Sequence, residues 1–339
     1  MKISILIPCY NEELTIERCL FSCLNQTRMA DEIIVVDDSS TDKTPKILEK
    51  FGESIKVVRT YKNTGNKSHA QEYGLQFVTG DVFVTTDGDT ILQDDFIEII
   101  EKDMRDVSVQ AVAGYVKSLK HNWITSCRAL DYAIGQNIDK AAQDFINFIF
   151  VIPGAAGVFR TDVFKEKIKF DHDTLTEDLD FTYRLHKAGC KIKFDRKAVC
   201  YTQDPTTLKE YINQMRRWFF GGWQNLLKHI ASAKKPRVAL ELSFIYIEGL
   251  FFSILIIVLP FVNLLMTLKF ILLYLIVMVA LALYCSVKEK RFDMLVYLPG
   301  YLFLRYVNAW IFTEQFIKEI ILKKKNLVWF KPKRIGINL

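Results

Sequence analysis

Two carboxylates one residue apart, Asp87 and Asp89, flank a glycine directly after a short run of apolar and threonine residues. A tight turn of this kind lets both carboxylates reach one hard divalent cation such as Mg²⁺ or Mn²⁺, which prefers oxygen ligands. A cation held there would bridge to a diphosphate and to the ribose beside it. Asp-Gly-Asp turns also occur in ordinary loops, so the motif gains meaning only from its neighbours.

Two further acidic motifs could take part in the same chemistry. Asp37 and Asp38 follow another apolar run, where carboxylates can accept hydrogen bonds from a base and a ribose, or can simply cap a helix. Glu177 and Asp178 follow Thr176, and one of them could act as a general base with a pKa raised by burial or by its neighbour. Capping of a helix N-terminus would explain this pair equally well.

A third kind of motif combines an amide, a cation and an aromatic ring within little more than one helical turn, at Gln214, Arg217 and Trp218. A guanidinium can clamp phosphate oxygens with two parallel hydrogen bonds, and an indole can stack against a sugar face. The surrounding residues 208–228 predict an amphipathic helix rich in Trp, which is typical of a membrane surface. The two roles are compatible.

The elements that must position these groups alternate between strands and helices. Short apolar runs predict buried strands at residues 3–8, 33–36, 55–59 and 81–86. Helices are predicted between them, the first beginning at Asn11 as its cap. This alternation predicts a doubly wound α/β domain with a mostly parallel sheet. Since the polar motifs follow the strands, they should gather at the carboxyl edge of the sheet, where such folds bind ligands.

Composition divides the chain into three parts. It has 339 residues, half of them hydrophobic, and a formal net charge of +6. Residues 1–235, including the amphipathic helix, have the pattern of a soluble α/β domain, whereas residues 238–322 are far more apolar. Residues 2–10 predict a strand rather than a signal peptide, so the first part is expected in the cytoplasm. Seven scattered cysteines favour buried thiols in a reducing compartment over a disulfide framework.

The apolar part predicts membrane segments. Stretches at about 244–262 and 264–287 are each close to the roughly 20 residues that cross a bilayer, and together they predict a helical hairpin. A third stretch, 294–317, carries charges, and a full crossing there would place basic residues outside, so it is predicted to lie in the interface or to dip in and return. The basic tail, residues 323–339, is expected to face cytoplasmic lipid. Nucleic-acid binding is disfavoured because no aromatic-basic module accompanies the tail.

In combination, these motifs resemble the family 2 glycosyltransferases, most closely the membrane-embedded branch of cellulose, chitin, hyaluronan and poly-N-acetylglucosamine synthases. That branch carries, in order, P-x-Y-N-E, an aspartate pair, D-x-D, T-E-D and Q-x-x-R-W. The matching residues here are Pro8-Cys9-Tyr10-Asn11-Glu12, Asp37-Asp38, Asp87-Gly88-Asp89, Thr176-Glu177-Asp178 and Gln214-Met215-Arg216-Arg217-Trp218. The resemblance covers roughly the first two-thirds of the chain.

The resemblance implies a GT-A fold, a UDP-sugar donor, a Mg²⁺ or Mn²⁺ ion and an inverting displacement. It implies Asp178 as the general base and Asp89, with Asp87, as the metal ligands. The donor-binding residues that it implies are Pro8, Tyr10, Glu12, Asp38, Lys67, Asp87, Gln214, Arg217 and Trp218. The acceptor-binding residues that it implies are Gly154, Ala155, Ala156, Glu177 and Trp218. The chain departs from the family pattern at Asn66, which splits a usual Gly-Lys pair, and at Glu72, where Asn is common.

Two activities stay open from the sequence. One is a processive synthase of a β-linked polysaccharide, and the other is a single-addition enzyme with a lipid acceptor, since Q-x-x-R-W also occurs in ceramide glucosyltransferase-like enzymes. With two or three membrane segments, a polymer channel within one chain would be thin. A non-catalytic nucleotide-sugar-binding membrane protein is disfavoured by the intact acidic motifs. A nucleotidyltransferase would not explain residues 214–218. The expected location is the cell membrane, multi-pass, with a cytoplasmic catalytic domain among membrane lipids, and a homo-oligomer would be compatible with it.

Overall fold

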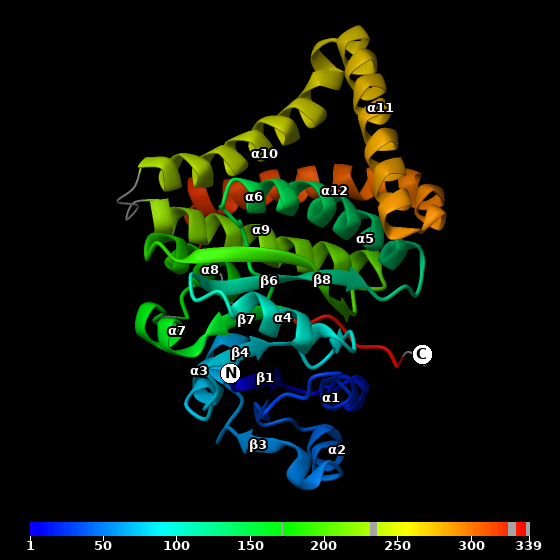
Figure 1. Ribbon diagram of the computed structural model, residues 1–339. Coiled ribbons are helices and arrows are strands. Elements are labelled where there is room, and N and C mark those ends of the chain that lie inside the picture. Colours follow the sequence, from blue (N-terminus) through cyan, green and yellow to red (C-terminus); the bar gives the residue numbers. More distant parts are fainter. Residues whose placement is uncertain (171, 231–235, 325–329, 337–339) are drawn as a thin grey trace.

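The computed structural model describes residues 1–170, 172–230, 236–324 and 330–336, with residues 236–245 as backbone only. Within these residues the strands are β1 (Ile3–Cys9), β2 (Glu32–Asp37), β3 (Lys56–Arg59), β4 (Val82–Thr85), β5 (Ile91–Leu92), β6 (Val109–Ser118), β7 (Gly157–Arg160) and β8 (Lys191–Thr202). They form one sheet in the order β3-β2-β1-β4-β7-β6-β8-β5 (Figure 1). The four strands predicted from apolar runs are all present.

The sheet is mixed, so the prediction of a mostly parallel sheet is right only for part of it. Strands β3, β2, β1 and β4 are mutually parallel, and β6 is parallel to β8. Strand β7, however, runs antiparallel to both of its neighbours, and β5 runs antiparallel to β8. The turn at Gly154 lies at the carboxyl edge beside Lys67. A strand that starts at this edge must run back in the opposite direction.

Alternate residues of the central strands feed two separate cores, one on each face of the sheet. In β1, Ile5 and Ile7 pack on one face and Leu6 on the other, as the period of two in a strand requires. Both faces are apolar because helices cover both, which is why these strands have continuous apolar runs rather than alternation. Burial of the core on both faces makes the carboxyl edge of the sheet a rigid support for the polar side chains that follow each strand.

The helices of the first two-thirds of the chain connect these strands. They are α1 (Ile16–Leu24), α2 (Thr44–Glu49), α3 (Lys67–Leu75), α4 (Phe96–Met104), α5 (Trp123–Ile134), α6 (Ala141–Phe145), α7 (Thr161–Lys167), α8 (Glu177–Lys187) and α9 (Leu208–Ile230), with 3-10 turn η1 (Gly52–Ser54) and π-helical turn η2 (Gly135–Lys140). The prediction that Asn11 caps the first helix is wrong. Asn11 has a positive φ of 52°, and its Oδ1 accepts a hydrogen bond from Thr41 N instead. All seven cysteines are free thiols.

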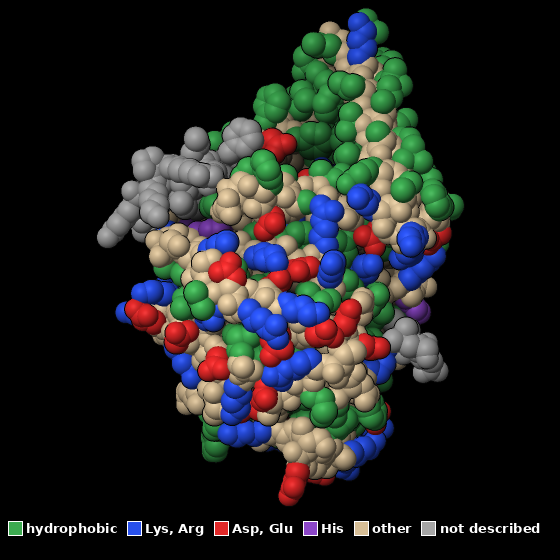
Figure 2. Space-filling view, viewed as in Figure 1, with side chains coloured by type: hydrophobic (Ala, Val, Ile, Leu, Met, Phe, Trp, Pro, Cys, Tyr) green, Lys and Arg blue, Asp and Glu red, His purple; other side chains and the backbone are tan. Residues whose placement is uncertain are grey.

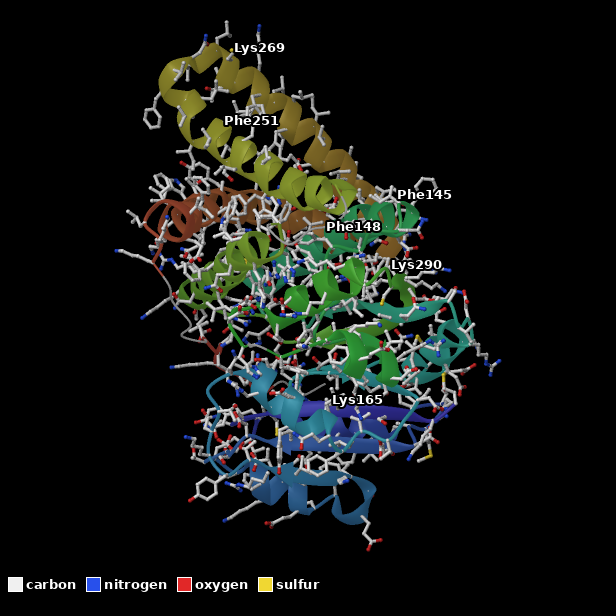
Figure 3. The ribbon with its side chains drawn as sticks, turned by 90° about the vertical axis from the view of Figure 1, so that its left-hand side faces the viewer. Phe145, Phe148, Lys165, Phe251, Lys269 and Lys290 are labelled. Atoms are coloured by element: carbon white, nitrogen blue, oxygen red, sulfur yellow. The ribbon has the colours of Figure 1, made fainter. Side chains whose placement is uncertain are left out.

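The last third of the chain comprises α10 (Pro236–Val262), α11 (Leu264–Glu289), η3 (Phe292–Tyr297), α12 (Leu298–Phe316) and η4 (Ile317–Ile321). Of these elements, α10 and α11 form an arch above the body. Helices α10 and α11 rise together from the body and meet at a tip near Lys269 (Figures 1 and 3). Figure 2 shows hydrophobic side chains covering this arch, whereas charged side chains gather on the body below it. The two predicted helices are therefore present and form a hairpin.

Among the described residues, one helix, α11, is long and apolar enough to span a bilayer, and the apolar part of α10, Tyr246–Val262, is shorter. Two complete spans are therefore not confirmed. The third apolar stretch does not stand out from the body, because α12 packs along α9, α10 and α5. In Figure 1 it lies across the top of the body at the foot of the arch. The interfacial placement of residues 294–317 stays a prediction.

Candidate active site

One cavity of about 920 Å³ lies between the carboxyl edge of the sheet and α9. Nearly all of the residues singled out from the sequence line it: Pro8, Tyr10, Glu12, Asp38, Lys67, Asp87, Asp89, Gly154, Ala155, Glu177, Asp178, Gln214, Arg217 and Trp218. The exceptions are Ala156, which is fully buried in the sheet core, and Asp37, which also does not line the cavity. The residues come from segments spread over more than 200 positions of the chain, so the fold assembles the site.

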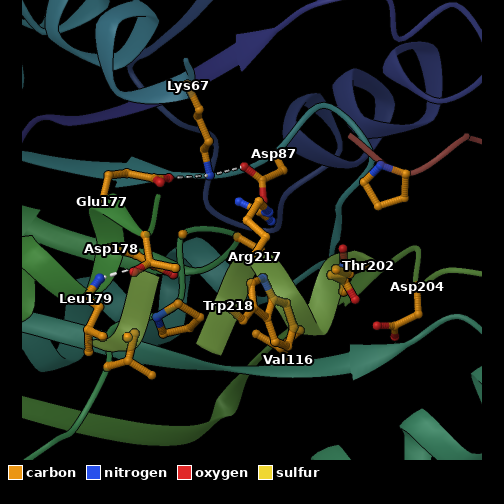
Figure 4. Close-up of a pocket in the computed structure, with 18 of the residues that line it drawn as sticks. Lys67, Asp87, Val116, Glu177, Asp178, Leu179, Thr202, Asp204, Arg217 and Trp218 are labelled. Carbon is orange, nitrogen blue, oxygen red and sulfur yellow. Dashed lines mark hydrogen bonds and ion pairs between the residues drawn. The ribbon is translucent and has the colours of Figure 1, made fainter. Parts of the chain in front are cut away.

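Lys67, the first residue of α3, joins two of the acidic motifs. Its Nζ forms an ion pair with Asp87 and lies 3.4 Å from Glu177 Oε1 (Figure 4). Burial alone would lower the pKa of Lys67, but the Asp87 and Glu177 carboxylates raise it, so the side chain stays charged. A Cβ at Gly154 would lie 2.7 Å from Lys67 Nζ, so a larger residue there would make the lysine end shift from its present position. Lys67 thus brings a permanent positive charge between the two motifs.

Asp178 lies on the cavity wall at the N-terminus of α8, next to Glu177 (Figure 4). Burial and the neighbouring Glu177 carboxylate raise the pKa of Asp178 to about 6, against the opposing charge of Lys67. Its Oδ1 accepts a hydrogen bond of 2.9 Å from Leu179 N. A carboxylate with this pKa is largely ionised near neutral pH yet basic enough to accept a proton, which suits a general base.

Asp89 and Glu12 form a second, more buried acidic pair, and two cations of the C-terminal tail cover it. Arg334 Nη1 lies 2.6 Å from Asp89 Oδ2, and Arg334 Nε lies 3.1 Å from Glu12 Oε2. Lys331 Nζ lies 2.8 Å from Glu12 Oε1. The backbone of Ile335 exchanges two hydrogen bonds with the Gln203 side chain, which fastens the segment to the end of β8. For these two cations, the prediction that the basic tail faces lipid is wrong.

The contact between Arg334 and Asp89 predicts competition with a divalent cation. In Arg334→Ala, Asp89 and Glu12 lose an opposing charge, so Mn²⁺ should bind more tightly in the absence of donor, by about three- to tenfold, or roughly 0.7–1.4 kcal/mol. Mn²⁺ titration by calorimetry or by paramagnetic water relaxation measures this. Lys333→Ala, at an exposed neighbouring position, serves as the control for a general loss of positive charge. Unchanged or weaker Mn²⁺ binding in the Arg334 variant would refute the competition.

Helix α9 supplies the remaining polar groups and is pinned to the acidic motif of α8. Asn225 Nδ2 donates to Thr176 O and Oγ1, both at 3.0 Å, and a Cβ at Gly221 would lie 2.6 Å from Thr176 Oγ1. This close approach orients the face of α9 that carries Gln214, Arg217 and Trp218 toward the cavity, as Figure 4 shows for the last two.

Gln214, Arg217 and Trp218 have different surroundings in the cavity wall. Gln214 is buried, and its Oε1 accepts no hydrogen bond from any described residue. Burial lowers the pKa of the Arg217 guanidinium, whose carboxylate neighbours Glu177 and Asp178 oppose the shift. The guanidinium of Arg128 lies 5.2 Å from the centroid of the Trp218 ring, and Arg128 is itself held by Asp204 at 3.2 Å. The indole therefore has a supported position in the cavity wall.

Asp38 organises the loop that closes the opposite end of the cavity. Its carboxylate accepts hydrogen bonds from Thr60 Oγ1, Asn63 Nδ2 and the backbone N–H and hydroxyl of Thr64, at 2.8–3.1 Å. Asp37 lies outside the cavity lining and pairs with Arg59 at 3.3 Å. Of the aspartate pair, only Asp38 can face a ligand. Its oxygens already hold the loop of residues 60–64 in place.

The residues present fit a divalent cation. Asp89 Oδ1 is buried and has no hydrogen-bond partner among the described residues, which is costly unless a ligand completes it. Burial, opposed by Arg334, raises the pKa of Asp89 to about 6, and Glu12 and Asp87 add to the rise. Such crowding of carboxylates is relieved when a cation joins them. Asp87 and Asp89 offer only oxygen donors, the ligand set of Mg²⁺ and Mn²⁺.

Several cavity residues carried no local signal in the sequence. Lys331 and Arg334 belonged to a basic run with no feature that separates them from their neighbours. Lys140 in η2 also lines the cavity; burial lowers its pKa to about 8, although Asp178 opposes the shift. Beyond Trp218 the cavity continues between α9, α10 and α12, where its walls are largely aromatic: Phe219, Tyr246, Phe252 and Phe312. The sequence marked these only as apolar helix positions.

Comparison with known proteins agrees with this geometry. A family model described as "Glycosyltransferase like family 2" matches residues 2–221, which include all of the motifs above. Poly-beta-1,6-N-acetyl-D-glucosamine synthase of Staphylococcus epidermidis is 29% identical over 239 residues, covering 69% of this chain and 58% of that protein. The synthase of Staphylococcus aureus strain COL is 30% identical with the same coverage. The chain thus spans 58% of the length of these relatives.

Solved structures share the fold. The mannosyltransferase PcManGT from Pyrobaculum calidifontis, in complex with GDP-Man and Mn²⁺, superposes with a TM-score of 0.65 at 22% identity, covering 90% of this chain and 86% of that one. S. aureus TarS 1-349 in complex with UDP-GlcNAc superposes with a TM-score of 0.52 at 17% identity, covering 71% of each chain. The fold is therefore of the known GT-A-like type, with a mixed sheet.

Proposed function

Since the chain belongs to the family 2 glycosyltransferases, we propose that it transfers a sugar from a UDP-sugar to a polysaccharide or lipid-linked acceptor at the cytoplasmic face of a membrane, with inversion at the anomeric carbon. The observation that carries this proposal is the arrangement of one cavity. A carboxylate with a pKa of about 6, Asp178, shares it with the buried Asp89 and with the cations Lys67 and Arg217. The S. aureus TarS structures hold UDP-GlcNAc and UDP, which supports the choice of nucleotide.

The chemistry follows from where these groups lie. Asp178 takes the proton from the acceptor hydroxyl. At the same time, the oxygen of that hydroxyl attacks the anomeric carbon from the face opposite the diphosphate. The bond from that carbon to the diphosphate oxygen breaks, and UDP leaves with the electron pair. Arg217 holds the diphosphate oxygens, and Lys67 keeps the neighbouring Asp87 and Glu177 in place. Asp38 and its loop border the base, and Trp218 stacks against the acceptor sugar.

A divalent cation, Mg²⁺ or Mn²⁺, would be held by Asp89 and Asp87 and would neutralise the charge that develops on the diphosphate. The Mn²⁺ named with the mannosyltransferase supports this choice of metal class. Arg334 pairs with Asp89 in this structure, so its side chain must move from that carboxylate before a cation can occupy the position.

One observation favours single addition to a lipid-linked acceptor as a second candidate. The acceptor end of the cavity continues into the aromatic section between α9, α10 and α12, at the foot of the exposed apolar arch. An acceptor with an apolar tail could enter from the bilayer there and present its polar end to Asp178. A growing glycan would instead use the same aromatic walls for stacking. The similarity to poly-beta-1,6-N-acetyl-D-glucosamine synthases favours a polysaccharide product.

The experiment that tests the proposal is UDP release by purified protein in detergent or nanodiscs, with Mn²⁺ or Mg²⁺, across a panel of UDP-sugars. Metal-dependent release with one donor is expected, and sizing of the product then separates a polymer ladder from a single glycolipid. If no UDP-sugar is turned over by folded protein supplied with lipid acceptors, the proposed donor class is wrong.

The pH dependence of the reaction should follow the raised pKa of Asp178. A general base works only when ionised, so kcat/KM should rise as pH increases through about 6 and level off above about 7. Initial rates from pH 5 to 8 at constant ionic strength, with melting curves at each pH, measure this. A flat profile across that range would rule out a base with this pKa.

A further inference from the structure

A cluster of nitrogen and oxygen donors lies outside the cavity of the candidate active site. His69 and Glu72 belong to α3, and His172 belongs to the segment that leads to α8. Their ligand atoms all lie within 4.8 Å of one another. None of the three lines the cavity described above. The cluster is therefore a separate feature that the proposed transfer reaction does not use.

The three side chains of the cluster contact one another directly. The rings of His69 and His172 stack with centroids 3.4 Å apart, and His172 Nε2 lies 3.0 Å from Glu72 Oε2. Two protonated imidazoles would repel each other at this separation. Burial and the proximity of His172 lower the pKa of His69.

A neighbouring hydroxyl orients one of the rings. Ser68 Oγ lies 2.7 Å from His172 Nδ1. When Nδ1–H donates to this hydroxyl, a metal ion can replace the proton that Nε2 shares with Glu72. Metal-binding histidines commonly have such a partner on their second nitrogen, and it fixes the tautomer and the ring direction.

We propose that His69, Glu72 and His172 bind a borderline transition-metal cation of the Zn²⁺ class, separate from the oxygen-only pair Asp87 and Asp89. Two imidazoles and one carboxylate form a ligand set that Zn²⁺ accepts with metal–ligand distances of about 2.0–2.2 Å. Tetrahedral ligands at such distances lie roughly 3.3 Å apart, and the three ligand atoms here lie within 4.8 Å of one another. The two stacked rings must turn out of their parallel arrangement before both can bind the same ion. Hard cations select the aspartate pair and softer ones select this cluster.

A metal bound to this cluster would affect the active site by fixing the position of α3 relative to the segment before α8. Lys67, which pairs with Asp87 and Glu177, is the first residue of the helix that carries His69 and Glu72. His172 stands five residues before Glu177 in the chain. A cation bound to all three ligands therefore ties α3 to the segment before α8, and holds the two ends of the Lys67–Glu177 pair at a set separation.

The test is Zn²⁺ titration of the purified full-length protein against a competing colorimetric chelator. The wild type should bind one equivalent of Zn²⁺ that His69→Ala and His172→Ala lose. Ser68→Ala should weaken binding by about ten- to a hundredfold, as the loss of an orienting partner does. His121→Ala, which removes an exposed histidine from another part of the chain, should retain the equivalent, as should Asp89→Asn.

Two further measurements distinguish loss of the metal site from loss of folding. Melting curves in excess chelator check that each variant folds, and added Zn²⁺ should raise the melting temperature of the wild type but not of His172→Ala. Co²⁺ bound to the wild type should give the intense visible bands of a four-coordinate site. Retention of the Zn²⁺ equivalent in the His69 and His172 variants, or its loss in Asp89→Asn, would overturn the proposal, as would a wild type that binds no Zn²⁺.

Discussion

Replacement of Asp178 by Asn should lower kcat by about 10²- to 10⁴-fold, the usual contribution of a positioned general base. The amide has nearly the same shape and can still accept the hydrogen bond from Leu179 N, but it has no charge to receive the acceptor proton. Donor binding should change little, because Lys67 and Arg217 remain. The readouts are single-turnover UDP release and calorimetric binding of UDP.

The control for this variant is Asp173→Asn. Asp173 lies in the same segment but is half-exposed, and it pairs with Lys228 rather than facing the cavity. It should keep nearly all of the activity. If Asp178→Asn turned over donor at the wild-type rate while remaining folded, another group would have to be the base, and Glu177, at the other end of the Lys67 pair, would be examined next.

The second large effect is expected at Asp89. Asp89→Asn should lower kcat/KM by about 10²- to 10³-fold, the loss typical when one preorganised charge is removed from a reacting site. An amide oxygen is a weaker ligand for a hard cation, and the variant also loses the carboxylate that Arg334 contacts. The Mn²⁺ concentration required for half-maximal activity should rise strongly, and chelation by EDTA should abolish the wild-type reaction.

Asp94→Asn provides a matched comparison five residues further along the chain, at an exposed position outside the cavity. Its metal requirement should equal that of the wild type. A metal requirement that stayed unchanged in Asp89→Asn, in protein with a normal melting curve, would show that Asp89 is not a ligand. The Arg334 variant then offers a cross-check, because its tighter Mn²⁺ binding depends on the same carboxylate.

Much of the site could be predicted because its parts are local. Each acidic motif follows a short apolar run, and the run itself predicts the buried strand that ends there. Five motifs in order then resemble one family, and the chain does belong to it. Helix α9 was equally predictable, since its amphipathic period is visible in the sequence and it covers residues 208–230 against a predicted 208–228.

What the sequence by itself determined is therefore the set of reactive groups and the elements that carry them: buried strands, the carboxylates that follow them, and an amphipathic helix with Gln214, Arg217 and Trp218. Tertiary structure alone decided the rest. Strand β7 runs antiparallel because the turn before it lies at the site. Ala156 lies in the core alone, whereas Ala155 contacts the core and also lines the cavity. Arg334 reaches Glu12 across 322 residues, and His172 reaches Glu72 across 100. Local propensity is encoded by neighbouring residues, whereas these pairings depend on which distant surfaces pack together, and no short stretch of sequence carries that energy.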